Sequence, residues 1–272
     1  MTLFALLGLP WFGWTFGLSL VGLLWWSISI TSRRDGAARG GAVIPKMFPT
    51  AASKARDEDV RDLSIGAVLS AMWGFPVDTL ATGAHAAEMQ GVLAESWDVK
   101  TGADSKTTLR WLLDVGHRDA FDVVLRFVGP DPSKASVEQL EEELGGNAAA
   151  RLEEPLGNFI ETHDELKRRG YIESPSDLDR GTSAWDYSRA VTVARFCHTA
   201  GYLTEEEAWG FIREAGERAR SEFGSWAEFH KSYVIGRAVW NGMSQLDNPN
   251  LRSVIDAVSD AHDSPWKKVS WS

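Results

Sequence analysis

The first 30 residues carry no charged side chain, and Arg33 and Arg34 follow almost directly. The hydrocarbon core of a bilayer is spanned by about 20 apolar residues in helical form. Residues 11–30 alone supply that length without a charge, Asn or Gln, and tryptophan pairs stand near both of their ends, as in the aromatic belts of membrane helices. We therefore expect a transmembrane anchor over 1–31, with residues 3–30 in the bilayer.

Two alternatives account for the apolar run less well. A cleaved signal peptide would have a basic segment, a shorter apolar core and a small-residue cleavage site. Nothing basic precedes this run, and residues 29–32 make a poor cleavage site. A buried helix of a water-soluble protein normally has one polar face. The run has only Thr15, Ser19, Ser27 and Ser29 to form one.

Basic residues near the ends of a span set its orientation. The N-terminal side of this span has no Lys or Arg, whereas Arg33, Arg34, Arg39 and Lys46 follow it. The sequence therefore predicts a single-pass membrane protein whose soluble domain is cytoplasmic.

The apolar run also contains a GxxxG spacing, formed by Gly13 and Gly17. This spacing allows two membrane helices to approach closely, although glycine is also common in membrane helices generally. The expected partners are thus the lipid bilayer through residues 3–30, a homodimer through Gly13 and Gly17, and a protein partner at the membrane.

The charges are distributed unevenly along the chain. Residues 31–56 hold six basic side chains and one acid, which leaves 22 basic and 37 acidic side chains on the remainder. Glycines and prolines punctuate residues 32–58, which indicates a basic flexible linker. An acidic body argues against nucleic acid as a partner, because binding phosphates needs clustered Lys and Arg.

The chain has one cysteine, Cys197, so no intrachain disulfide can form. Cys197 lies in an expected helix, which favours a small buried hydrophobe over a nucleophile. The six histidines form neither HExxH nor an i,i+4 pair. The sequence also lacks a Walker-type GKS/T, a GxGxxG after a strand and a GxSxG. We therefore expect no metal site and no cofactor.

The region 59–272 has a helical pattern almost throughout, which predicts a compact all-α domain with many helices. Three capping boxes begin at Ser136, Thr204 and Ser225, and glycines stand where helices should end. VVLRFV at 123–128 is the one candidate strand, but it continues a helical pattern. The expected helices cover 60–74, 79–94, 105–116, 118–128, 136–144, 147–169, 183–199, 205–222, 226–243 and 250–261.

The long helix expected over 226–243 carries one aromatic stripe at steps of three and four residues. Gly236 falls on that stripe, where a missing side chain would let another helix approach. Arg237 borders it, and a buried guanidinium there would need a carboxylate partner or aromatic faces. The stripe consists of Trp226, Phe229, Tyr233, Trp240 and Met243.

The chain has 13 tryptophans, and seven of those in the body fall mostly at helical core spacings. Large rings fill helical interiors routinely, so core packing is favoured over an aromatic-lined pocket. The seven are Trp73, Trp97, Trp111, Trp185, Trp209, Trp226 and Trp240.

The most distinctive polar cluster is Trp185-Asp186-x-x-Arg189. Asp186 and Arg189 are three residues apart and can pair on one helix. The plainer interpretation of Asp186 is a first-turn acid that favours the helix dipole. The alternative places Asp186, Arg189 and Arg237 in one polar pocket beneath the tryptophans. The candidate binding residues are Trp185, Asp186, Arg189, Tyr233, Arg237 and Trp240, and no catalytic residue is assigned.

Several short motifs in fixed order resemble the bacterial family known as domain of unknown function 1266, over about 60–243 and most densely over 183–243. The resemblance implies a domain but no established activity or catalytic residue. The N-terminal anchor is an addition to it. The motifs are Trp73-Gly74, Ala184-Trp185-Asp186-x-x-Arg189, Ala200-Gly201-Tyr202-Leu203, Glu206-Glu207-Ala208-Trp209, Ser225-Trp226-x-x-Phe229 and Tyr233-x-x-Gly236-Arg237-x-x-Trp240.

Two classes of function remain open. The leading hypothesis is a membrane-tethered cytoplasmic binding or scaffold domain, based on the anchor and the missing catalytic motifs. The alternative is an unfamiliar enzyme that acts on an anionic or nucleotide-like ligand through Asp186, Arg189 and Arg237. A component of an interbacterial toxin or immunity system is a third hypothesis, which no residue specifically supports.

Overall fold

The computed structural model describes residues 48, 55–129 and 131–272, and all regular structure within them is helical. This confirms the all-α, multi-helix body. The helices before residue 145 are α2 (Asp57–Ser64), α3 (Ala67–Trp73), α4 (Ala86–Trp97), α5 (Gly102–Asp114), α6 (Arg118–Val128), the 3-10 turn η2 (Pro132–Lys134) and α7 (Val137–Leu144). The later helices are α8 (Gly146–Arg168), α9 (Pro175–Asp179), α10 (Ser183–Thr199), α11 (Glu205–Glu222), α12 (Trp226–Leu246), α13 (Pro249–Asp260) and α14 (Pro265–Lys268).

Part of the sequence analysis concerns residues that lie outside this description. The expected membrane span 3–30, the Gly13 and Gly17 spacing and most of the linker 32–58 belong to that part. Among the described helices, none is long and apolar enough to cross a membrane. Helix α2 begins at Asp57, so regular structure starts inside the expected linker.

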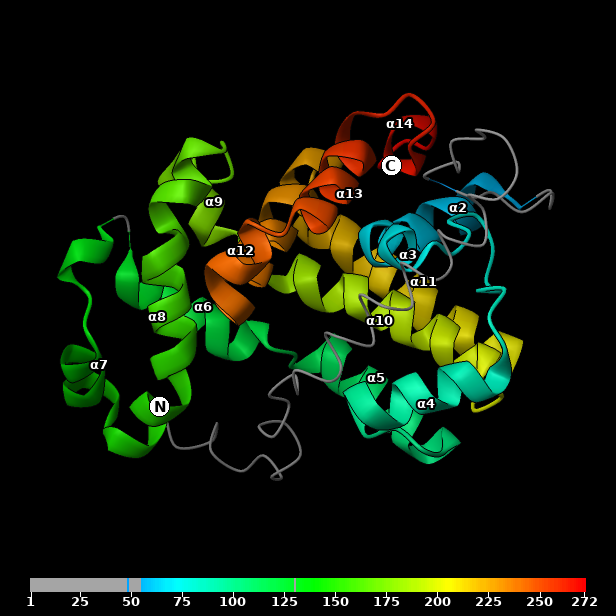
Figure 1. The fold of residues 1–272 in the computed structure, drawn as a ribbon, viewed down its shortest axis with the longest axis horizontal. Helices are drawn as coiled ribbons and strands as arrows, with labels where there is room; N and C mark the ends of the chain where they lie inside the picture. The colour runs from blue at the N-terminus through cyan, green and yellow to red at the C-terminus, as the bar shows by residue number, and fades with distance from the viewer. Residues whose placement is uncertain (1–47, 49–54, 130) are drawn as a thin grey trace.

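Helix α10 is the centre of the fold. Figure 1 shows α10 running through the middle of the molecule, with α7 and α8 at one end and α2 and α4 at the other. Helices α3, α4, α5, α6, α11 and α12 all contact α10. Every residue from 183 to 197 is buried. Three of them, Asp186, Arg189 and Arg195, carry charges, so the helices around α10 have to supply polar partners as well as apolar packing.

Two expected helices differ from the observed ones. The helix expected over 60–74 is divided into α2 and α3 at Ile65 and Gly66. A Cβ atom at Gly66 would lie 2.9 Å from Cγ1 of Val191 on α10. The chain therefore turns where it passes closest to the central helix.

The helix expected over 79–94 begins only at Ala86, so the prediction was wrong for residues 79–85. The reason lies far along the chain, in the buried guanidinium of Arg195. It donates hydrogen bonds to the carbonyls of Pro76 (2.7 Å), Leu80 (3.3 Å) and Ala81 (3.3 Å) and to the hydroxyl of Ser70 (2.6 Å). Because these carbonyls accept hydrogen bonds from Arg195, the segment before α4 is a loop rather than the first turns of a helix.

Helix starts follow the capping signals closely. Thr204 and Glu207 form a complete capping box, with N···O distances of 2.9 and 3.2 Å. Ser136 and Ser225 also accept hydrogen bonds from the third residue of their helices. Helix α9, which we did not expect, begins with a further box at Ser174, and α14 was also unexpected.

Helix α12 is interrupted at Asn241 and Gly242. Asn241 has φ −151° and ψ 27°, and Gly242 has φ 57° and ψ −152°. The Gly242 conformation is open almost solely to glycine. A Cβ atom there would also meet the side chains of Asn158 and Glu161 at 2.8 and 2.9 Å. The expected helix over 226–243 is thus two helical segments that change direction after Trp240.

The crossing of α10 and α12 depends on Gly236, as the stripe pattern predicted. A Cβ atom at Gly236 would lie 2.7 Å from Cβ of Trp185 and 3.3 Å from Cβ of Thr182. The backbones of α10 and α12 therefore approach closely because Gly236 has no side chain.

The tryptophans pack mainly into the core, which confirms the interpretation favoured by their spacing. Trp185 is buried, and the other six body tryptophans of the pattern pack against the core cluster. Near the C-terminus, three indole N–H groups tie the last segment to the body. They are Trp226 to the Val269 carbonyl (3.1 Å), Trp266 to that of Ser64 (2.8 Å) and Trp271 to that of Phe223 (2.7 Å).

Candidate functional site

The six candidate residues come together where α10 crosses α12. The guanidinium carbons of Arg189 and Arg237 lie 4.7 and 5.0 Å from the ring centroid of Trp185. The Tyr233 and Trp240 rings lie 5.5 and 5.6 Å from the same ring. Trp185 is therefore the common neighbour of the cluster, and Asp186 follows it on α10.

Asp186 is fully buried, and its carboxylate binds the start of α6 rather than its own helix. It accepts hydrogen bonds from the backbone N–H groups of His117 (3.0 Å) and Arg118 (2.9 Å). The Arg118 guanidinium also contacts it at 3.3 Å, and Arg189 donates to it as well. The carboxylate thus has four donors, two of which are orphan N–H groups at a helix N-terminus.

Arg189 joins Asp186 to His117. Its Nη2 donates to Asp186 and lies 2.7 Å from Nδ1 of His117. Because a guanidinium can only donate, Nδ1 of His117 is the acceptor, and the proton of the neutral ring is on Nε2. Burial, together with the Arg189 charge, lowers the pKa of His117 to about 2.

Arg237 has aromatic and amide partners instead of a carboxylate. It donates to the Tyr233 hydroxyl (3.0 Å) and to Oε1 of Gln245 (2.5 Å), and it approaches Sδ of Met72 at 3.7 Å. Its side chain is 5% exposed, and no ion pair joins it to a carboxylate of the described residues. Of the two environments expected for this guanidinium, the aromatic one is present.

Three buried N–H groups of the cluster have no hydrogen-bond partner among the residues that the structure describes: Nε1 of Trp185, Nε of Arg189 and Nε of Arg237. Leaving a buried donor unpaired costs about 1–3 kcal/mol, and more for a charged group. The cluster also has more guanidinium groups than carboxylates, since Asp186 serves both Arg118 and Arg189. The cluster therefore carries a net positive charge.

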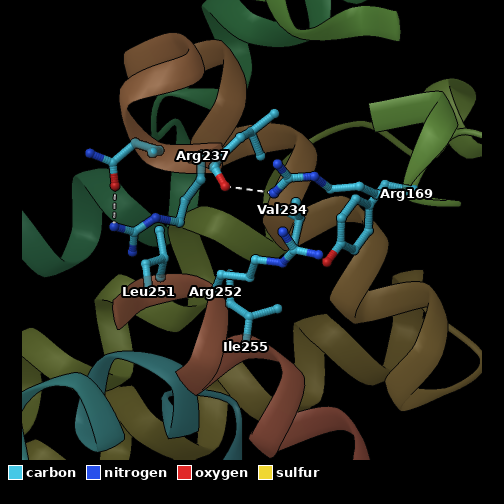
Figure 2. A pocket seen from close by; sticks show the side chains of 9 residues that line it. Arg169, Val234, Arg237, Leu251, Arg252 and Ile255 are labelled. Carbon is cyan, nitrogen blue, oxygen red and sulfur yellow. Dashed lines mark hydrogen bonds between the residues drawn. The ribbon is translucent and has the colours of Figure 1, made fainter. Parts of the chain in front are cut away.

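The break in α12 joins this cluster to a small pocket. Eight residues of a continuous helix span about 12 Å, yet Arg237 and Gln245 are hydrogen-bonded because the chain turns between them. Arg237 and Gln245 also line the pocket, which Figure 2 shows from close by. Its other walls are Arg169, Tyr171, Val234, Leu246, Leu251, Arg252 and Ile255.

A family model described as a protein of unknown function, DUF1266, matches residues 92–271, which are 180 of the 272 residues. The chain belongs to the DUF1266 family. The DUF1266 match contains all six candidate residues, and it begins later and ends later than the resemblance predicted. Comparison with curated proteins and with solved structures finds no match.

Sequence reasoning missed several residues of this DUF1266 site. His117 and Arg118 are 69 and 68 residues from Asp186, so only the fold reveals their contact. Gln245 lies shortly after Asn241-Gly242, a dipeptide typical of turns. That signal could have predicted the break in the helix expected over 226–243. The pocket arginines Arg169 and Arg252 carried no motif.

Other titratable groups of the DUF1266 body fit structural roles. Cys197 is fully buried, and burial raises the pKa of its thiol to about 11, which supports a packing role. Within the described residues, no group of three or more His, Cys, Asp or Glu side chains could hold a metal ion.

The buried imidazole of His117 predicts how the stability of the DUF1266 body depends on pH. Below pH 6.5 the unfolded chain binds a proton at this ring, whereas the folded chain stays neutral down to about pH 2. The free energy of unfolding should therefore fall as the pH drops from 6.5 to 4, by up to about 1.4 kcal/mol per pH unit. Thermal or urea unfolding across this range measures the slope.

The control for this prediction is His117→Gln, which keeps an acceptor for Arg189 but cannot titrate. Its stability should depend less on pH, although His230, whose pKa burial lowers to about 4, still contributes. Nitrogen-15 NMR should report the Nε2–H tautomer of His117. An imidazole that titrates near pH 6.5 in the folded chain would contradict the assignment.

Proposed function

We propose that this chain is a membrane-tethered binding module whose helical body lies at the cytoplasmic face of a bacterial inner membrane. The tether is the uncharged segment 3–30, and the basic residues that follow it favour a cytoplasmic body. The net charge of −15 on the residues that follow Arg56 would keep the body away from anionic lipid, so the basic linker is the part that meets the surface.

One observation favours binding over acid–base catalysis. Asp186, the only acid among the candidate residues, is 0% exposed and already accepts four N–H groups. A general base needs a free lone pair within reach of a substrate proton. Freeing Asp186 would leave Arg189 and the start of α6 without their acceptor. Asp186 is therefore a poor general base, which removes the main support for the enzyme hypothesis. The anionic ligand of that hypothesis still agrees with the excess of guanidinium groups.

The orientation can be tested with the protein's own cysteine as background. Cys197 is fully buried, so the wild-type chain should not react with a membrane-impermeant maleimide. In intact spheroplasts, Thr2→Cys should be labelled directly, whereas Ser272→Cys should be labelled only after permeabilisation. The opposite pattern would overturn the cytoplasmic placement.

The binding function can be tested by crosslinking the full chain in its native membrane before solubilisation. A stoichiometric protein partner or a retained small ligand is expected. A homogeneous chain that carries neither would contradict a binding module.

A further inference from the structure

The pocket beside Arg237 lies where the end of α8, the break in α12 and the start of α13 meet. Figure 2 shows Arg169, Arg237 and Arg252 around it, with Val234, Leu251 and Ile255 as apolar walls. Its volume, including the mouth open to solvent, is about 300 Å³. The enclosed part has room for about one water molecule, so a larger group would also have to occupy the open mouth.

The charged residues of the lining are all cations, in contrast to the acidic chain as a whole. Among the described residues, three arginines and no carboxylate line the pocket, although the whole chain has a net charge of −10. The acids that pair with these arginines lie outside the lining, and they hold Arg169 more closely than Arg252. Arg169 is held by Glu165 and Asp247, whereas Arg252 reaches Asp256 only at 3.9 Å.

Arg237 gives the strongest indication of a missing ligand. Its guanidinium is nine-tenths buried, has no carboxylate within ion-pair distance in the described residues, and keeps an unpartnered Nε. Burying an unpaired charge is costly, and an anion in the adjoining pocket would offset that cost. The carbon of the same guanidinium lies over the Trp185 ring, 5.0 Å from its centroid.

The broken helix supplies the rest of the pocket. Beyond Gly242, α12 returns Gln245 to Arg237 and brings the Leu246 carbonyl to Arg169, at 2.5 and 2.6 Å. These two hydrogen bonds hold two arginines at opposite sides of the same pocket. Tyr171 adds a phenol whose pKa is raised by burial, so it remains a proton donor at neutral pH.

We propose that this pocket binds a phosphoryl group through Arg237, Arg252 and Arg169. Guanidinium groups match phosphate oxygens in geometry and charge. Here they come from three separate elements, and a tetrahedral group with several acceptor oxygens can accept from all three. A planar carboxylate offers only two oxygens in one plane. The proposal rests on the proposed binding function and names the chemistry of its ligand.

The phosphoryl group has two sources within reach of a membrane-tethered body, a lipid headgroup and a soluble phosphate monoester. The probes are inorganic phosphate and glycerol 3-phosphate, added to the full chain in detergent micelles. Saturable binding is expected by calorimetry, with broadening of the phosphorus-31 NMR line of the monoester. The full chain in phosphatidylcholine nanodiscs then separates the sources. If phosphatidic acid in the nanodisc weakens monoester binding, a headgroup reaches the pocket; if it does not, the ligand is soluble.

Three variants make the test specific. Arg252→Gln removes a half-exposed guanidinium that has only a weak ion pair, so the body should fold normally. Arg237→Lys keeps the charge but loses the planar fork. Each should weaken phosphate binding at least about tenfold. Arg213→Gln is the matched control, because Arg213 is similarly exposed, pairs with Asp59 at 3.5 Å and lies on α11, away from the pocket.

The outcomes separate this proposal from the function it rests on. The phosphate site would be overturned if the wild-type chain showed no saturable binding, or if all three variants lost the same amount of phosphate affinity. A partner found by crosslinking would still support the binding module in either case. Release of inorganic phosphate from the monoester, seen in the same phosphorus spectra, would instead overturn the binding function.

Discussion

Asp186→Asn should lower the free energy of unfolding by about 3–5 kcal/mol, the range for breaking one side of a buried charge pair. The substitution keeps the shape of the side chain but removes its charge and turns an amide N–H toward groups that themselves donate. Arg189 would then remain buried beside a neutral side chain, and the first N–H groups of α6 would lose an acceptor. Thermal unfolding of the full chain in detergent measures the loss.

The matched control is Asp98→Asn. Asp98 pairs with Lys100 at 2.5 Å, but both side chains are more than half exposed. Exposed pairs contribute about 0–1 kcal/mol, and Asn tolerates the left-handed conformation found at Asp98. The control should therefore stay within about 0.5 kcal/mol of the wild type. If the two variants lost equal stability, the structural role of Asp186 would be wrong.

Gly236→Val is expected to cost about 2–3 kcal/mol through overpacking. The first added carbon would lie 2.7 Å from Cβ of Trp185, an atom close to the backbone that cannot rotate away. Helices α10 and α12 would have to separate, which would also move Arg237 from the face of Trp185. The variant should show both a lower unfolding temperature and an altered tryptophan emission.

Gly210→Ala on α11 tests the addition of a side chain to a helical glycine where space is open. Nothing lies within 4 Å of the position that its Cβ would take. Alanine in a helix interior should therefore raise stability by about 0.5–1 kcal/mol. Opposite signs at Gly236 and Gly210 are the expected result, and a loss at both would contradict an effect specific to the helix crossing.

Local signals in the sequence predicted much of the fold. The expected helices 118–128, 183–199 and 205–222 match α6, α10 and α11 to the residue. Their starts and stops depend on caps and glycines within a few residues, which a single sequence contains. The family also followed from motifs, which are densest over α10, α11 and α12.

The sequence could not predict features set by distant contacts. The loop before α4 depends on Arg195, which lies more than 100 residues later in the chain. In the same way, the carboxylate of Asp186 satisfies the preceding helix α6 rather than its own helix dipole. Nothing near Asp186 in the sequence identifies that acceptor role, because the donors are backbone groups that any residue would provide.

The candidate site was predictable in its members but not in its form. Spacing placed Trp185, Asp186 and Arg189 close together on one helix, and the aromatic stripe placed Tyr233 and Trp240 on one side of another, with Arg237 beside them. Their meeting required the close crossing at Gly236. The pocket required the break after Trp240, and two of its arginines, Arg169 and Arg252, belong to segments whose patterns are those of ordinary solvated helices.

The position of α10 has a consequence for the synthesis of this protein. Its walls come from both sides of the sequence, from α3 to α6 before it and from α11 and α12 after it. The ribosome must therefore release the chain to about residue 246 before the core can close around α10. Residues 3–30 emerge long before that point. If they insert as proposed, attachment to the bilayer precedes folding, and the body completes its core while already held at the membrane.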